Sequence, residues 1–91
     1  MRYDDLPGAE LVLPGIEDLR RGVESVPALL VAIGRPRLVE LDLDVPSHSF
    51  DAPERRLYLR LAAEHGDEAH SRYNALLRRL VSFERAAECA S

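Results

Sequence analysis

The C-terminal part of the chain carries a long apolar stripe with helical spacing, and this stripe limits what the sequence can fold into. Six apolar residues in the segment 67–88 recur at spacings of four, three, four, three and four: Ala69, Tyr73, Leu76, Leu80, Phe83 and Ala87. This spacing places their side chains on one face of an α-helix. We therefore expect a long amphipathic helix here, on which shorter elements of the chain pack.

Two further apolar residues, Leu77 and Val81, widen the stripe on one side. The rest of the chain offers few elements to cover them, and large exposed apolar patches on soluble proteins usually mark a partner surface. We therefore predict that Leu77, Val81 and Tyr73 contribute to an interface between two copies of the chain, because twofold dimers are the commonest oligomers. The alternative is that residues 11–13 cover Leu77 and Val81 within one chain.

A second helix is predicted directly before this stripe. Asp51 and Glu54 have the spacing of a capping box, and Gly66 is suited to end the helix. The connection is so short that it forces the helices 52–65 and 67–88 into an antiparallel hairpin. We expect this hairpin to be the scaffold of the fold.

The N-terminal segment contains two turn dipeptides, Pro7-Gly8 and Pro14-Gly15. Such dipeptides favour turns over regular elements. We therefore expect residues 1–15 to form an extended arm laid across the helices. A short helix over residues 16–21 follows, and Gly22 is expected to end it.

Residues 26–33 are apolar all round, which is typical of a buried central helix. Ser25 is suited to cap its beginning and Gly34 to end it. Together these segments predict one all-α domain over residues 1–91, with about five helices.

The segment 36–45 is ambiguous. Its apolar and acidic residues alternate from Val39 to Val45, which is the pattern of a half-buried strand. The competing interpretation is a short helix over residues 36–41, with Pro36 in its first turn, followed by an extended tail. We favour the helix because no convincing partner strand exists, and pairing with residues 10–13 is the alternative.

The composition is that of a soluble globular protein, with 46% hydrophobic and 31% charged residues. The formal net charge of −4 argues against a nucleic-acid binder and favours a neutral or basic partner. The single cysteine, Cys89, permits no intramolecular disulfide, which fits a reducing compartment. The first ten residues lack the apolar core of a signal peptide, and the longest apolar run, residues 26–33, is too short to span a bilayer. We therefore expect a cytoplasmic protein without a membrane segment.

Arg60 and His65 form the pattern R-x4-H near the end of the predicted 52–65 helix. This pattern resembles the motif of HEPN-type RNases, small helical proteins in which an arginine and a histidine project towards an RNA phosphate. The resemblance implies Arg60 and His65 as catalytic candidates. Twelve arginines and three histidines in 91 residues give roughly one such match by chance. A surface arginine and a histidine favoured by the helix dipole therefore explain the pattern without catalysis.

Three other groupings give weaker indications of chemistry. His65 and His70 are five residues apart, which is not the spacing of zinc ligands on one helix. Ser47-His48-Ser49 lacks the glycine pattern of a nucleophile elbow. Residues 26–33 and 36–41 resemble a helix-turn-helix in outline, but the acids that follow would repel DNA phosphates. We therefore expect neither a metal nor a cofactor.

These observations favour a non-catalytic interaction protein or subunit that associates with itself through its helices. The alternative is a nucleic-acid-directed regulator, or a HEPN-like RNase or toxin–antitoxin component in which Arg60 and His65 react. Binding to RNA or DNA that weakens steeply with salt would distinguish the second class from the first.

Overall fold

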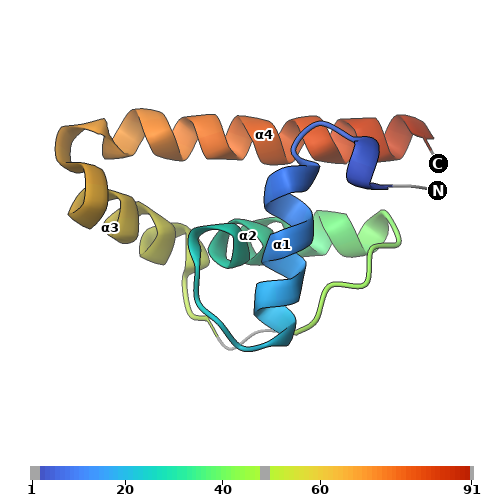
Figure 1. The fold of residues 1–91 in the computed structure, drawn as a ribbon, viewed down its shortest axis with the longest axis horizontal. Helices are drawn as coiled ribbons and strands as arrows, with labels where there is room; N and C mark the ends of the chain where they lie inside the picture. The colour runs from blue at the N-terminus through green and yellow to red at the C-terminus, as the bar shows by residue number, and fades with distance from the viewer. Residues whose placement is uncertain (1–2, 48–49, 91) are drawn as a thin grey trace.

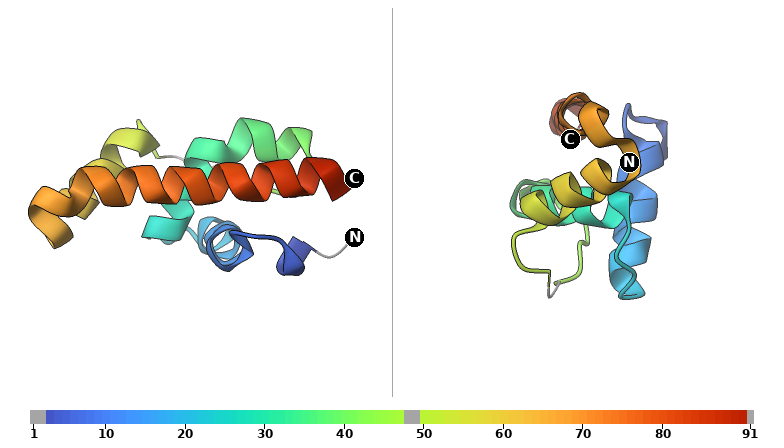
Figure 2. Two further views of the ribbon diagram at one scale, coloured as in Figure 1. Left: turned by 90° about the horizontal axis from the view of Figure 1, so that it is seen from above. Right: turned by 90° about the vertical axis from the view of Figure 1, so that its left-hand side faces the viewer.

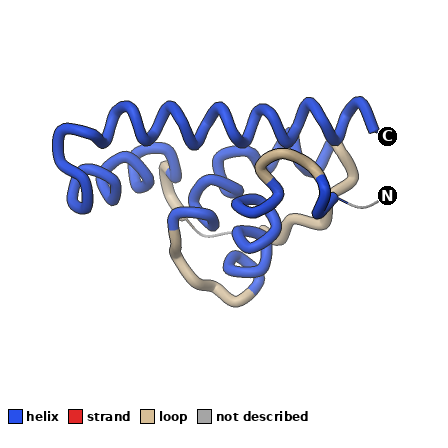
Figure 3. Tube along the Cα trace, turned by 45° about the horizontal axis from the view of Figure 1, so that its top comes forward, coloured by secondary structure: helices blue, strands red, loops and turns tan. Residues whose placement is uncertain are grey.

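The computed structural model describes residues 3–47 and 50–90, and over these residues it is entirely helix and loop (Figures 1 and 3). The four α-helices are α1 (Ala9–Arg20), α2 (Val26–Glu40), α3 (Pro53–His65) and α4 (Ala69–Ala90), with two short 3-10 helices, η1 (Tyr3–Asp5) and η2 (Gly66–Glu68). The predicted all-α class is confirmed. The expected number of about five helices was too high, because two predicted helices are joined in α2.

Helix α2 lies at the centre of the molecule. Helix α1 crosses it at a steep angle, and α4 runs along one side of the molecule, over α2 and one end of α1 (Figures 1 and 2). With a rise of about 1.5 Å per residue, the 22 residues of α4 cover most of the 38 Å longest dimension. The predicted buried character of residues 26–33 is confirmed for Ala28–Ala32, all of which are buried.

The crossing of α1 over α2 depends on Gly15. A Cβ atom at this position would lie 2.4 Å from the carbonyl oxygen of Pro27 and 2.6 Å from Cγ2 of Val31. The first of these atoms belongs to the backbone and has no freedom to move aside. Only glycine therefore permits the two helices to approach this closely.

The predicted extended arm over residues 1–15 is wrong, because α1 begins at Ala9 and passes straight through Pro14-Gly15. Pro14 is exposed, and so is Glu10, the residue whose carbonyl loses its helical hydrogen bond to position 14. The buried residues of α1 form one stripe: Ala9, Val12, Gly15, Ile16 and Leu19. Burial of this stripe against α2 outweighs the local preference for a turn. Gly22, in a left-handed conformation, follows the helix as predicted.

The predicted end of the central helix at Gly34 is also wrong. Helix α2 continues through Gly34 and Pro36 to Glu40, which excludes the helix-turn-helix outline. A Cβ atom on Gly34 would lie 2.9 Å from Cδ2 of Leu80, so this glycine serves helix packing. The predicted cap at the other end of α2 is confirmed, since the Ala28 amide donates to Ser25 Oγ over 3.1 Å.

The end of α2 is a Schellman motif. Asp42 adopts a left-handed conformation with φ of 69°, and the Leu43 amide donates to the Leu38 carbonyl over 3.1 Å. The chain then runs extended, with Leu43 and Val45 buried and Asp44 between them exposed. The helix-plus-tail interpretation is therefore correct, and the alternation reflects one chain laid on the core.

Helix α3 ends at Gly66 as predicted, but Asp51 does not cap its beginning. Ala52 occupies the N-cap position, with φ of 48° and without a side-chain hydrogen bond. The described α3 residues that are fully buried are Leu57 and Leu61. The rings of Tyr58 and Tyr73 meet edge to face, with centroids 5.7 Å apart, and join α3 to α4.

The apolar stripe of α4 faces the core as predicted. Ala69, Leu80, Phe83 and Ala87 are buried, and Tyr73 and Leu76 are half-buried. The stripe packs on α3 through Tyr73 and on α1 and α2 through its later residues, since Phe83 lies close to Gly8 and Leu80 lies against Gly34. The predicted α3–α4 hairpin is present, but α2 rather than this hairpin organises the core.

The two helix glycines give a matched pair of substitutions. We expect Gly15→Ala to destabilise the fold by more than about 2 kcal/mol, because its new methyl group meets backbone. Gly34→Ala meets only the flexible ends of the Leu80 and Glu84 side chains and gains about 0.5–1 kcal/mol of helix propensity, so its net effect is small. Urea denaturation measures both, and equal losses would contradict the assigned close approach.

Candidate interaction surface on helix α4

Helix α4 has one side that the other described elements leave open. A shallow hollow on this side is lined by six residues of α4: Asn74, Leu77, Arg78, Val81, Ser82 and Arg85. Their spacings of three, one, three, one and three keep them on one side of the helix. We refer to these six residues as the outer face of α4.

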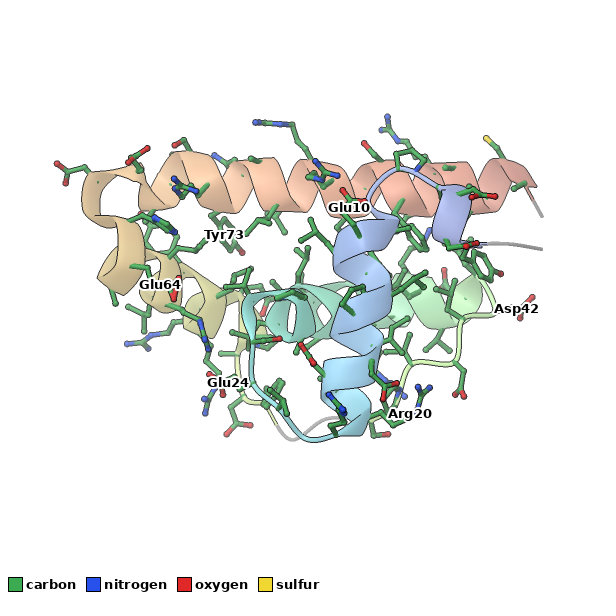
Figure 4. All side chains as sticks on the ribbon, viewed as in Figure 1. Glu10, Arg20, Glu24, Asp42, Glu64 and Tyr73 are labelled. Atoms are coloured by element: carbon green, nitrogen blue, oxygen red, sulfur yellow. The ribbon has the colours of Figure 1, made fainter. Side chains whose placement is uncertain are left out.

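The outer face exists because the opposite side of α4 is fixed to the core. Arg79 forms an ion pair with Glu10 where α1 meets α4 (Figure 4). Leu80 packs against Gly34 of α2, as described above. With both flanks held, the helical phase turns Val81 and Arg85 towards solvent.

The structure places the three predicted interface residues in different environments. Val81 is 41% exposed, and it lies on the outer face. Leu77 also lines this face but is half-buried and packs against the core. Tyr73 is half-buried and points from α4 towards α3, where it contacts Tyr58 (Figure 4). Residues 11–13 belong to α1, and they leave Val81 exposed.

Two arginines of the outer face have no partner in the described part of the chain. Arg78 and Arg85 take part in none of its hydrogen bonds or ion pairs. Six other arginines lie within 4.0 Å of a carboxylate: Arg20, Arg21, Arg37, Arg56, Arg60 and Arg79. Arg78 and Arg85 were not predicted as site residues from the sequence. The available signal was the seven-residue spacing of Arg78 and Arg85 around Val81.

The structure gives Arg60 an architectural role. Its Nη1 donates to the Glu24 carbonyl over 3.1 Å, and its Nε lies 3.7 Å from Glu64 Oε2. Arg56 donates to the Glu24 carboxylate over 3.0 Å. These contacts join α3 to the segment before α2. His65 Nε2 lies 3.9 Å from Glu64 Oε1, so Glu64 stands beside both members of the R-x4-H pattern.

The other candidate groupings do not converge on a reactive centre. Across residues 3–47 and 50–90, no three histidine, cysteine or carboxylate side chains gather as a metal site would require. His70 lies 3.2 Å from the Asn74 amide nitrogen on its own helix. His48 and Ser49 of the Ser47-His48-Ser49 group lie outside the described residues. None of the described helices is long and apolar enough to cross a membrane.

The carboxyl group of Glu84, on α4, is partly buried. Partial burial raises the pKa of its carboxyl group, and the opposing effect of the Arg37 guanidinium is smaller. Its side chain lies beside Gly34, so it faces α2 rather than the outer face. Glu88 is likewise held by Arg37 across the α2–α4 contact.

No family model, curated protein or solved structure matches this chain. Its function must therefore be inferred from its own surface.

Replacement of Arg60 provides a test of the R-x4-H pattern. We expect the parent, Arg60→Ala and His65→Ala all to leave RNA intact, because Arg60 is bound to Glu24. Arg60→Ala should cost roughly 0.5–1.5 kcal/mol through its lost hydrogen bond. Arg55→Ala, on the same helix and exposed, is the control and should change stability less. RNA cleavage by the parent that both substitutions abolish would contradict this assignment.

The raised pKa of Glu84 has a consequence for stability. An acid whose pKa is raised by folding stabilises the protein below its unfolded pKa, of about 4.3, and this contribution is lost as the pH rises through the folded value. Glu84→Gln should therefore raise the melting temperature at pH 7, and the gain should disappear at about pH 3. Thermal unfolding at both pH values measures this, and a gain that persists at low pH would refute the cause given.

Proposed function

We propose that this protein is a non-catalytic interaction protein that binds a helix of a partner on the outer face of α4. The observation that carries the proposal is the combination on one uncovered helix side of an exposed Val81, a half-buried Leu77 and two unpaired guanidinium groups. Arginine is enriched at the energetically important positions of protein interfaces, and the buried core of an interface is more apolar than the rest of the surface.

A helix is the partner element that suits this face. The six residues follow the axis of α4 from Asn74 to Arg85, over about 16 Å at 1.5 Å per residue. Ridges of side chains on one helix pack into the grooves of another at small crossing angles. A helix laid along α4 would therefore cover Val81 and Leu77 together, as amphipathic helices do in apolar grooves.

Self-association remains a prediction from the apolar residues alone. In a symmetrical pair joined through this face, Arg78 and Arg85 of both copies would share one interface. Like charges placed together oppose association. The charge of the face therefore weighs against a second copy as its occupant. We expect the protein to act in the cytoplasm, as its cysteine usage indicates.

The second candidate function is nucleic-acid binding, and the same unpaired arginines favour it. Guanidinium groups bind phosphates bidentately. The net charge of −4 and the apolar residues Leu77 and Val81 beside these arginines favour a protein partner instead. A gel shift with RNA or DNA that weakens steeply with salt would support the nucleic-acid alternative.

Photocrosslinking on the outer face tests the proposal. A benzophenone amino acid at Ser82 should form protein adducts in the native host, and Val81→Glu should abolish them, because a charge then replaces the apolar contact. Val39→Glu is the matched control, since Val39 is 43% exposed on α2 and lies outside the outer face. Adducts that persist in Val81→Glu, or that Val39→Glu also abolishes, would contradict the proposal. Circular dichroism verifies that both variants fold.

A further inference from the structure

The charges around the outer face of α4 indicate the chemistry of its partner. Arg78 and Arg85 are seven residues apart, or about 10.5 Å along the helix, on the same side of α4. The acids closest to them on the helix are engaged elsewhere. Glu84 lies beside Gly34, and Glu88 is paired with Arg37. Both carboxylates are thus held on the α2 side of the helix.

The outer face carries two arginines and no carboxylate among its six residues. The described part of the chain supplies carboxylates to six of its arginines, and its overall charge is −4, so acids are in excess. Arg78 and Arg85, like Arg55 and Arg72, nevertheless have no acid partner within the described residues. The outer face is therefore locally cationic on an acidic protein, with Val81 between its two charges and Leu77 next to Arg78.

We infer that the outer face binds an acidic amphipathic helix from another protein, an inference that rests on the function proposed above. Carboxylates about two turns apart on such a helix would meet both guanidinium groups and form bidentate pairs. Aliphatic residues between these carboxylates would cover Val81 and Leu77. A second copy would instead bring four guanidinium groups together, and none of the six residues of the face supplies a carboxylate.

A display library of helical peptides tests the inference while the partner itself is still unidentified. The full-length parent is the target, and the Val81→Glu variant serves for counter-selection. We expect the enriched peptides to carry Asp or Glu seven residues apart, flanking aliphatic residues. Their affinity should fall about tenfold or more on Arg78→Glu with Arg85→Glu, and should fall with rising salt.

Arg55→Glu with Arg72→Glu is the matched control. These two arginines are also exposed and unpaired within the described residues, they lie outside the outer face, and their replacement changes the net charge equally. We expect this control to alter affinity by less than about threefold, a long-range effect only. Equal losses in the two double variants would overturn the inference. If Arg78→Glu with Arg85→Glu does not fold, Arg78→Gln with Arg85→Gln should show the same loss.

The two proposals fail in distinguishable ways. If no peptide survives the counter-selection with Val81→Glu, the outer face is not a docking site and both proposals fail. If the peptides depend on Val81 but are neutral or basic, only the acidic partner is refuted. If light scattering shows a dimer that Val81→Glu dissociates, the occupant is a second copy, which also refutes the acidic partner.

Discussion

The fold depends on how closely α1 approaches α2. Gly15 lacks the side chain that would otherwise meet the Pro27 carbonyl and Val31. This approach encloses Val12, Leu29 and Val31, which have no exposed surface. In a chain of 91 residues the core is small, so the loss of one close contact removes a large share of the stability.

Two further close contacts at glycine residues determine the position of α4. A Cβ atom on Gly8 would lie 2.6 Å from the Arg79 carbonyl, where α1 meets α4. Gly34 lies against Leu80, where α2 meets α4. Each of these three helix contacts therefore contains a glycine. Together they fix the rotation of α4 about its axis and so determine which residues form the outer face.

The sequence predicted those features that local patterns determine. The spacing of the α4 stripe gave the correct helix and the correct buried face, and Ser25, Gly22 and Gly66 mark helix ends as expected. Prediction from the sequence failed where a glycine next to a proline is needed for the close packing of two helices. Pro14-Gly15 has the local character of a turn, yet it lies inside a helix, because the neighbour that needs Gly15 is distant in the sequence.

The candidate surface could be predicted only in part, because some of its features depend on contacts between residues distant in the sequence. Val81 was identified from helical spacing, but whether Arg78 and Arg85 have partners depends on which acids lie nearby in space. Net charge was a poor guide, since it favoured a neutral or basic partner, whereas the outer face itself is cationic. A global sum of charges does not describe one helix face.

Native-state amide hydrogen exchange tests most directly whether the α1–α2 crossing is the centre of stability. We expect the amides of Val12 and Ile16 and those of Leu29–Val31 to exchange only through global unfolding, with the free energy that urea denaturation gives. Amides of α3 should exchange through smaller openings, because few of its side chains are buried. Exchange of the α1 amides at a lower free energy than those of α3 would contradict this account.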